Sequence, residues 1–207
     1  KDEGEGMDMY NVGKSRGAGG TGVWDGKQLY TGVNYASWKV LANGPVRAIF
    51  ELHYAAWDAA GKKVSEIKRF TVDAGHQLDR IDSTFQYEGN EPITVAVGLN
   101  KNPSDKNQDP SITVKREGPV LLQWVEQKSN DAFGTAVVIP GAEGFAQDQL
   151  NELILAKATS GKPLRYYAGG AWSRAGEITS LAQWQKYLQD VAARAGSPVR
   201  VTLARQQ

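Results

Sequence analysis

The chain has 207 residues, enough for one domain with a sizeable core. Its 24 Lys and Arg nearly balance its 23 Asp and Glu, and a net charge of +1 predicts neither a nucleic-acid nor a membrane partner. The absence of cysteine excludes disulfides, thiolate metal sites and a cysteine nucleophile. No run approaches the roughly 20 apolar residues of a membrane span. We therefore expect residues 1–207 to form a single domain.

Residues 1–22 are rich in glycine and acidic side chains and show no periodicity, which predicts a loop. The stretch Gly17-Ala-Gly-Gly-Thr-Gly22 lacks the Gly-Lys-Ser/Thr ending of a phosphate-binding loop. Four nearby carboxylates could bind Ca²⁺, although their spacing is not that of an EF-hand. A solvated acidic loop is the favoured interpretation, and no other cofactor is expected. These carboxylates belong to Asp2, Glu3, Glu5 and Asp8.

The stretch from Asn34 to Tyr54 predicts two strands joined at Ala42-Asn-Gly-Pro45, because Asn-Gly favours a hairpin turn and Pro45 restarts an extended segment. From Val46 the pattern has period two, so one face is expected to enter a core and the other to be polar. The apolar face carries Val46, Ala48, Phe50, Leu52 and Tyr54. The polar face carries Arg47, Ile49, Glu51 and His53.

Further short strands are separated by turn signals, a pattern typical of an antiparallel β-sandwich or barrel. The polar stretch 100–110 is predicted to be a loop, and 166–174 to be a dense aromatic stretch around two glycines. The predicted strands are 28–31, 64–72, 78–87, 93–99, 112–115, 120–126, 135–139, 152–158, 164–167 and 199–203.

One amphipathic helix is predicted over residues 181–195. Ser180 is a suitable N-cap, and Gln183 three residues later completes a capping box. Gly196 stands where a helix commonly ends, and Pro198 prevents continuation. An apolar stripe predicts packing against a sheet. The stripe consists of Leu181, Trp184, Leu188 and Val191, with Ala195 following.

The polar strand faces are the candidates for chemistry. His53 and His76 are the only histidines and do not have the spacing of a zinc enzyme, and no Gly-x-Ser-x-Gly elbow exists. Paired carboxylates could hydrolyse a glycosidic bond, whereas a base with a cationic partner could remove the proton α to a uronate carboxylate. The candidate catalytic residues are His53, His76, Arg47, Glu51, Arg80 and Asp82.

Aromatic and cationic side chains near these strands suit a sugar ligand, because flat rings stack on sugar faces. The alternative is that the charges form cross-strand ion pairs on a solvated sheet and that the rings serve burial. The candidate substrate-binding residues are Trp38, Trp57, Arg69, Tyr166, Tyr167, Trp172 and Arg174.

Several of these stretches resemble the DUF4861 family, a bacterial family known only as a domain of unknown function. The strongest is Ser37-Trp-Lys-Val-Leu-Ala-Asn-Gly-Pro-Val-Arg47, and the resemblance runs over essentially the whole chain. The other matching stretches are Gly4–Asp8, Val12–Arg16, Val64–Arg69, Asp73–Gly75, Tyr166–Gly176, Trp184–Leu188 and Ser197–Val201.

The resemblance implies a galactose mutarotase-like β-sandwich from an exported bacterial system that degrades plant or algal polysaccharide. Family members usually begin with further strands, so we expect this chain to be the C-terminal part of a longer domain. A strand edge should then be uncovered, or be completed by a second chain or segment.

Together these features predict a periplasmic or secreted protein acting on an oligo- or polysaccharide. The favoured function is a lyase or hydrolase for an acidic, uronate-containing glycan. A non-catalytic carbohydrate-binding module and a mutarotase-like sugar epimerase are the alternatives.

Overall fold

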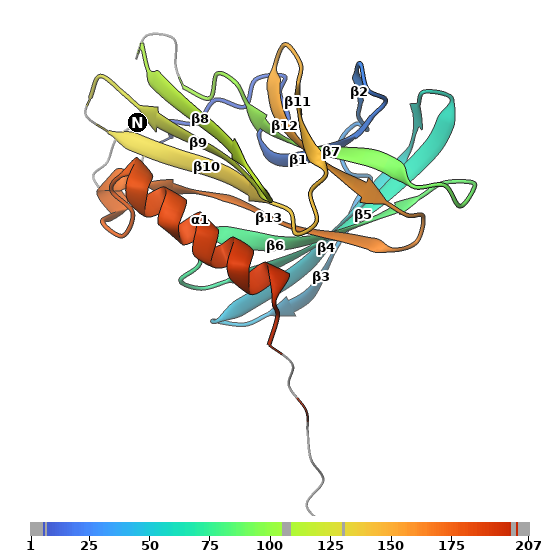
Figure 1. Cartoon of the computed structure of the whole chain (residues 1–207). Helices are drawn as coiled ribbons and strands as arrows, with labels where there is room; N and C mark the ends of the chain where they lie inside the picture. The colour runs from blue at the N-terminus through green and yellow to red at the C-terminus, as the bar shows by residue number, and fades with distance from the viewer. Residues whose placement is uncertain (1–5, 7, 105–108, 130, 200–201, 203–207) are drawn as a thin grey trace, which may run out of the picture.

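Two antiparallel β-sheets of unequal width face each other, and one helix packs on the far side of the wider sheet (Figure 1). The computed structural model describes residues 6, 8–104, 109–129, 131–199 and 202. Within these residues the predicted mainly β sandwich with one C-terminal helix is confirmed. No described helix is long and apolar enough to cross a membrane.

The wider sheet has eight strands in the order β3-β4-β5-β6-β13-β10-β9-β8, joined mostly by hairpins. The hairpin β3–β4 lies at one edge and β8 at the other. The bounds are β3 Ser37–Asn43, β4 Arg47–Ala59, β5 Lys62–Asp73, β6 Leu78–Gln86, β8 Ser111–Glu117, β9 Val120–Glu126, β10 Ala132–Val138 and β13 Pro163–Trp172.

The narrower sheet has five strands in the order β11-β12-β7-β1-β2. Apolar side chains from the two facing sheet surfaces fill the space between them, including Phe85, Val97 and Ile154, each fully buried. We call the surface of the wider sheet that faces the narrower sheet its inner face. The bounds are β1 Ala18–Trp24, β2 Leu29–Tyr30, β7 Ile93–Asn100, β11 Gly144–Gln147 and β12 Asn151–Ala158.

Helix α1 (Leu181–Gly196) covers part of the outer face, where it contacts β9 and β10. Its buried residues Trp184, Leu188 and Val191 come from the predicted apolar stripe. The oxygen Oγ of Ser180 accepts a hydrogen bond from the backbone N–H of Gln183, as a capping box requires. The reciprocal bond differs, because Gln183 Oε1 accepts from Thr179 instead of Ser180.

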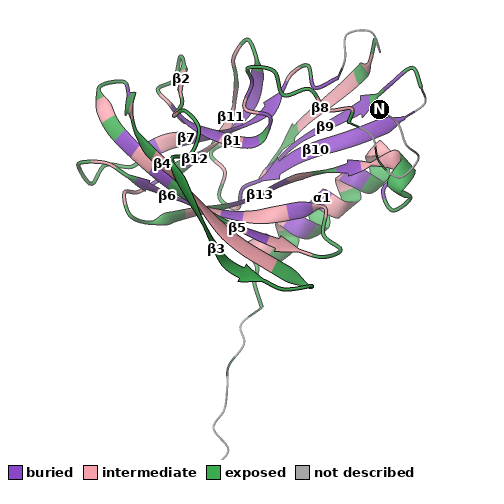
Figure 2. Cartoon of the chain, turned by 180° about the vertical axis from the view of Figure 1, so that it is seen from behind, coloured by how far each residue is buried: buried purple, intermediate pink, exposed green. Residues whose placement is uncertain are grey.

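The alternation predicted for β4 is confirmed, but the expected core on its apolar face is only half formed. The partners across β4 and β5 place Phe50 opposite Phe70 and Glu51 opposite Arg69, so apolar and charged residues do separate onto two faces. However, Phe50 and Leu52 are only half-buried, and every residue of β3 is exposed. The reason is that the hairpin extends past the narrower sheet (Figure 2).

Part of the predicted N-terminal loop is in fact strand β1, which lies between β7 and β2. The strand was missed because its glycines have low strand propensity. They are required by close packing: a Cβ on Gly22 would lie 2.7 Å from Cδ1 of Leu29. At Gly19 the backbone has φ of +95°, where the register with β7 shifts.

The strand predicted over 164–167 is longer than expected, because β13 continues as a regular strand to Trp172. Its glycines admit neighbouring backbone, since a Cβ on Gly169 would lie 2.2 Å from the carbonyl oxygen of Gln77. Strand β11 was not predicted. Most of the predicted strand 199–203 lies outside the described residues, and Val199 is not in a strand.

The helix packing can be tested with Leu188→Ala. Leu188 of α1 is fully buried between the helix and the sheet, so its truncation should lower the free energy of unfolding by about 2–5 kcal/mol in a urea titration. The exposed neighbour Gln189→Ala should change it by less than about 0.5 kcal/mol. Equal effects of the two substitutions would contradict the packing described.

Candidate functional site

Most of the predicted catalytic residues share the outer face of the wider sheet, where they form a ladder of ion pairs across β4, β5, β6 and β13. Arg47 Nε lies 2.5 Å from Asp73 Oδ1, and Arg69 Nη2 lies 2.6 Å from Glu51 Oε1. His53 Nε2 is 3.4 Å from the other oxygen of Glu51. The ladder continues on β6 and β13 through Arg80, Asp82 and Arg165.

The ladder favours the charged form of two of its carboxylates. Hydrogen bonds from Arg69 hold the pKa of Glu51 below its usual value, and Arg47 does the same for Asp73. The arginines are about half exposed, with 55% of the Arg47 side chain and 53% of the Arg69 side chain accessible to solvent. Such exposed pairs contribute little to stability and do not require a ligand to explain them.

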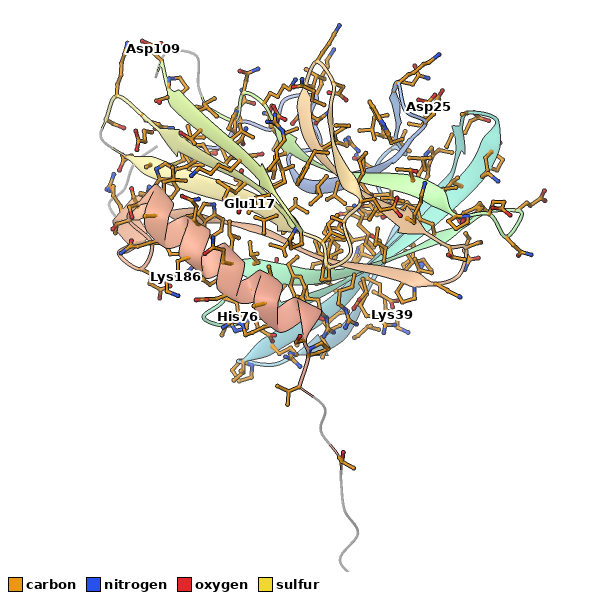
Figure 3. All side chains as sticks on the ribbon, in the orientation of Figure 1. Asp25, Lys39, His76, Asp109, Glu117 and Lys186 are labelled. Carbon is orange, nitrogen blue, oxygen red and sulfur yellow. The ribbon has the colours of Figure 1, made fainter. Side chains whose placement is uncertain are left out.

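A second group of predicted residues lines a cavity of about 230 Å³ between the outer face and the end of α1. His76, Arg80 and Tyr167 meet there, and Figure 3 shows His76 beside the helix. Asp73 also lines this cavity, but both of its carboxylate oxygens bind Arg47. A histidine and an engaged carboxylate therefore come together on this side.

A cavity of about 520 Å³ lies on the inner face, opposite the ladder. Strands β4 and β5 form one wall. The other is formed by β1, the segment before it, and residues 32–35 between β2 and β3. Of the predicted residues, Trp57 lines it. The full lining is Val12, Ser15, Arg16, Gly20, Thr21, Gly32, Val33, Asn34, Tyr35, Tyr54, Trp57, Glu66 and Lys68.

The floor of this inner cavity carries the buried side chains of Glu66 and Lys68, which are 4% and 7% exposed. The Glu66 carboxylate accepts hydrogen bonds from Thr21 Oγ1 on β1 and, at 2.7 Å, from Ser83 Oγ on β6. The ammonium of Lys68 lies 3.9 Å from Glu66 Oε1, too far for a hydrogen bond. Within the described residues the contacts of this ammonium are Glu66 and the ring of Tyr54, neither of which accepts a hydrogen bond from it.

Arg16 brings a second cation to the inner cavity. Its backbone N–H donates to Asn151 Oδ1 at 2.6 Å. Glycines make room for it, since a Cβ on Gly98 would lie 2.8 Å from Cβ of Arg16 and one on Gly20 would lie 2.4 Å from its carbonyl oxygen. Two cations and one carboxylate leave the cavity suited to a ligand with one negative charge.

Burial sets the proton affinities in the inner cavity. The pKa of Lys68 is lowered by burial first and by the nearby Arg16 charge, with Glu66 opposing the shift. The pKa of Tyr54 is raised by burial and by the Glu66 charge. The Lys68 ammonium lies over the Tyr54 ring, 5.4 Å from its centroid. Tyr54 therefore remains a neutral proton donor, and Lys68 loses its proton more readily than a solvated lysine.

The remaining predicted binding residues lie elsewhere. Tyr166 is fully buried and donates its hydroxyl hydrogen bond to the carbonyl of Gly19, so it belongs to the core. Trp172 lies under the guanidinium of Arg174, whose carbon is 5.0 Å from the ring centroid. Arg174 also pairs with Asp131 at 3.5 Å. Trp38 lies on the inner side of β3 and is 65% exposed.

Three residues of the predicted acidic Ca²⁺ group, Asp2, Glu3 and Glu5, are not among the described residues. Within the described residues no three acidic or histidine side chains gather closely enough to hold a metal ion.

Comparison with known proteins places the chain. Residues 1–201 match the model of a domain of unknown function, DUF4861. The chain belongs to this family. It is also 30% identical over 210 residues to "Uncharacterized protein P7" of Formosa agariphila, an alignment that covers 98% of this chain and 51% of that protein. The DUF4861 chain thus spans about half the length of the curated relative it matches.

Sequence reasoning missed most of the inner cavity of this DUF4861 chain, although one signal was present. Glu66 and Lys68 lie between Val64 and Phe70 on the core-facing side of β5. A charged pair at positions that should be apolar indicates either a structural ion pair or a functional site. Arg16 could not be found this way, because it precedes a strand that was predicted to be a loop.

The outer ladder can be tested with Arg69→Gln. Because Arg69 is the main cause of the lowered Glu51 pKa, the substitution should raise that pKa toward its usual value in a carbon-detected NMR titration. A lowered carboxyl pKa stabilises the fold above the unfolded-state pKa, and this contribution is lost as pH falls through the folded-state pKa. The stability difference from wild type should therefore vanish in acid.

The matched substitution for this titration is Arg165→Gln, since Arg165 pairs with Asp82 and not with Glu51. This substitution should leave the pKa of Glu51 at its wild-type value. The ladder as described would be wrong if Glu51 titrated identically in wild type and in Arg69→Gln.

Proposed function

We propose that the inner cavity binds an acidic sugar residue of a polysaccharide and that the protein is a carbohydrate-active enzyme, in the first place a lyase. The observation that carries this is the buried Lys68, whose donors face a cavity of about 520 Å³ that Arg16 also lines. The carboxylate of a uronate residue supplies the single negative charge that the two cations and Glu66 leave unbalanced. The rings of Tyr35, Tyr54 and Trp57 supply apolar surface for the sugar.

The lining favours elimination over hydrolysis. Glycoside hydrolysis commonly needs two carboxyl groups on either side of the bond, and Glu66 is the only carboxylate among the described lining residues. Both Glu66 oxygens are already engaged, since each accepts from Thr21 and one accepts from Ser83. β-Elimination instead needs cations to stabilise the enolate, a base and a proton donor.

The groups of the inner cavity can be assigned to the steps of an elimination. Arg16 neutralises the uronate carboxylate, which acidifies the adjacent C–H. The protonated Lys68 helps to bind the substrate, whereas in complexes where Lys68 is neutral Arg16 alone holds the carboxylate and Lys68 removes that proton. The lowered pKa of Lys68 makes this neutral form accessible. The electron pair forms the C=C bond as the glycosidic C–O bond breaks. Tyr54, kept protonated by its raised pKa, donates a proton to the departing oxygen.

The proposal also includes where the protein acts and what accompanies it. Polysaccharide substrates lie outside the cytoplasm, which agrees with the periplasmic or secreted location expected from the family resemblance. The expected second chain or segment that completes the sheet stays a prediction.

Catalysis can be tested by incubating the protein with polymers of mannuronate, guluronate, galacturonate and glucuronate. Elimination creates a C=C bond conjugated with the carboxylate, so ultraviolet absorbance should rise with at least one polymer. Saturable binding without unsaturated product or new reducing ends would identify a non-catalytic binding module. Absence of both binding and product with all four polymers would contradict the proposed function.

Lys68→Met tests the cavity itself. It should weaken acidic-sugar binding about 10- to 100-fold, the value of a charge-assisted hydrogen bond. Lys63→Met is the matched control, because Lys63 lies on the same strand but points to solvent from the outer face. In wild type the affinity should fall as pH rises through the lowered pKa of Lys68, since only its protonated form binds the carboxylate. Equal binding by both variants would show that Lys68 does not contribute to the binding site.

A further inference from the structure

The hairpin β3–β4 and the loop before it concentrate the exposed apolar surface of the molecule. Of the ten large hydrophobic side chains that are exposed among the described residues, six lie between Val33 and Val46. The inner side of β3, which we call the apolar strip, carries Trp38, which is 65% exposed, and Val40, which is 53% exposed. Apolar surface gathered in this way commonly marks a binding site. Figure 2 shows β3 exposed along its length, where the narrower sheet does not reach.

The strand register connects this surface to the inner cavity. Trp38 lies opposite Leu52, Leu52 opposite Lys68, and directly opposed residues project from the same face. Trp38 is therefore on the inner face, two strands from Lys68. Neighbouring strands are about 4.8 Å apart, which places the two positions roughly 10 Å from each other. A disaccharide can span this separation, whereas one pyranose ring cannot.

By the strand register Leu52 lies between Trp38 and Lys68, and two aromatic residues border the cavity itself. Tyr35 lines the cavity and meets Tyr54 edge to face, with ring centroids 6.5 Å apart. Tyr54 in turn lies beside the Lys68 ammonium. Through Leu52 the exposed apolar surface of β3 thus leads to the charged cavity.

We infer that the inner side of β3, centred on Trp38, is a second sugar subsite, so that the site takes a polysaccharide chain and not a free monosaccharide. This rests on the proposed function of the cavity. The residue in the cavity is held by charge, and its neighbour in the chain stacks its C–H face on the Trp38 ring. The unpaired backbone groups along the free edge of β3 add hydrogen-bond partners for sugar hydroxyls.

A strand of another polypeptide is a poorer occupant of the same strip. The pairing of β3 shifts register between Val40 and Ala42, and such an irregularity twists an edge away from regular extension. Lys39, on the same exposed strand, adds a charge of the kind that blunts an edge. These features leave side-chain stacking as the main interaction that the strip offers.

The test compares uronate monomer, dimer and trimer by titration calorimetry. In wild type the affinity should rise about tenfold from monomer to trimer, the value of one aromatic contact. Trp38→Ala should abolish that gain while monomer binding stays unchanged. Ile67→Ala is the control, because Ile67 is an exposed apolar residue on the outer face of β5, and it should retain the gain.

The inference is overturned if monomer and trimer bind wild type equally, or if Trp38→Ala keeps the gain. If wild type binds the monomer and its affinity does not depend on oligomer length, only the subsite is contradicted. If wild type binds no acidic sugar, the proposed function is contradicted as well. Analytical ultracentrifugation of both proteins completes the test. A wild-type dimer that Trp38→Ala dissociates, with no length dependence, would assign the strip to contact between copies and overturn the subsite.

Discussion

The carboxylate of Glu66 is the interaction on which the inner side of this structure depends. It accepts hydrogen bonds from Thr21 on the narrower sheet and from Ser83 on the wider one, so it joins the two layers where their apolar core ends. Burying a carboxylate is costly unless its oxygens are satisfied. Once satisfied, Glu66 stabilises a second buried charge, that of Lys68, which the apolar surroundings alone would disfavour.

The unequal width of the two sheets determines what surrounds this pair. The narrower sheet covers only part of the wider one, so the inner face passes from apolar core to charged cavity to exposed aromatic strip. All three zones are formed by inward-facing side chains of the same sheet, and they differ in how deeply those side chains are buried. The outer face follows a different plan, in which α1 covers β9 and β10 and a ladder of ion pairs meets solvent on β4, β5, β6 and β13.

The two faces also separate residues that are neighbours in sequence. His53 and Tyr54 are adjacent, yet one contacts Glu51 on the outer face and the other borders the inner cavity. The predicted group of Arg47, Glu51 and His53 was placed on one face, as observed. The ring of Trp38, which was expected to act with them, lies on the opposite face with Lys68.

Features that depend on local sequence could be predicted. The period-two alternation of β4 and the capping and apolar stripe of α1 are set by the geometry of a strand and of a helix, which each short segment carries within itself. Strand β1 and the inner cavity could not be predicted, because they depend on which segments lie against each other. Gly22 is small because Leu29 packs against it, and Glu66 is tolerated because Thr21 and Ser83 reach it from two sheets. The sequence by itself determined the strand faces and the helix, while only the tertiary structure decided which face is enclosed, since enclosure arises from contacts between distant segments.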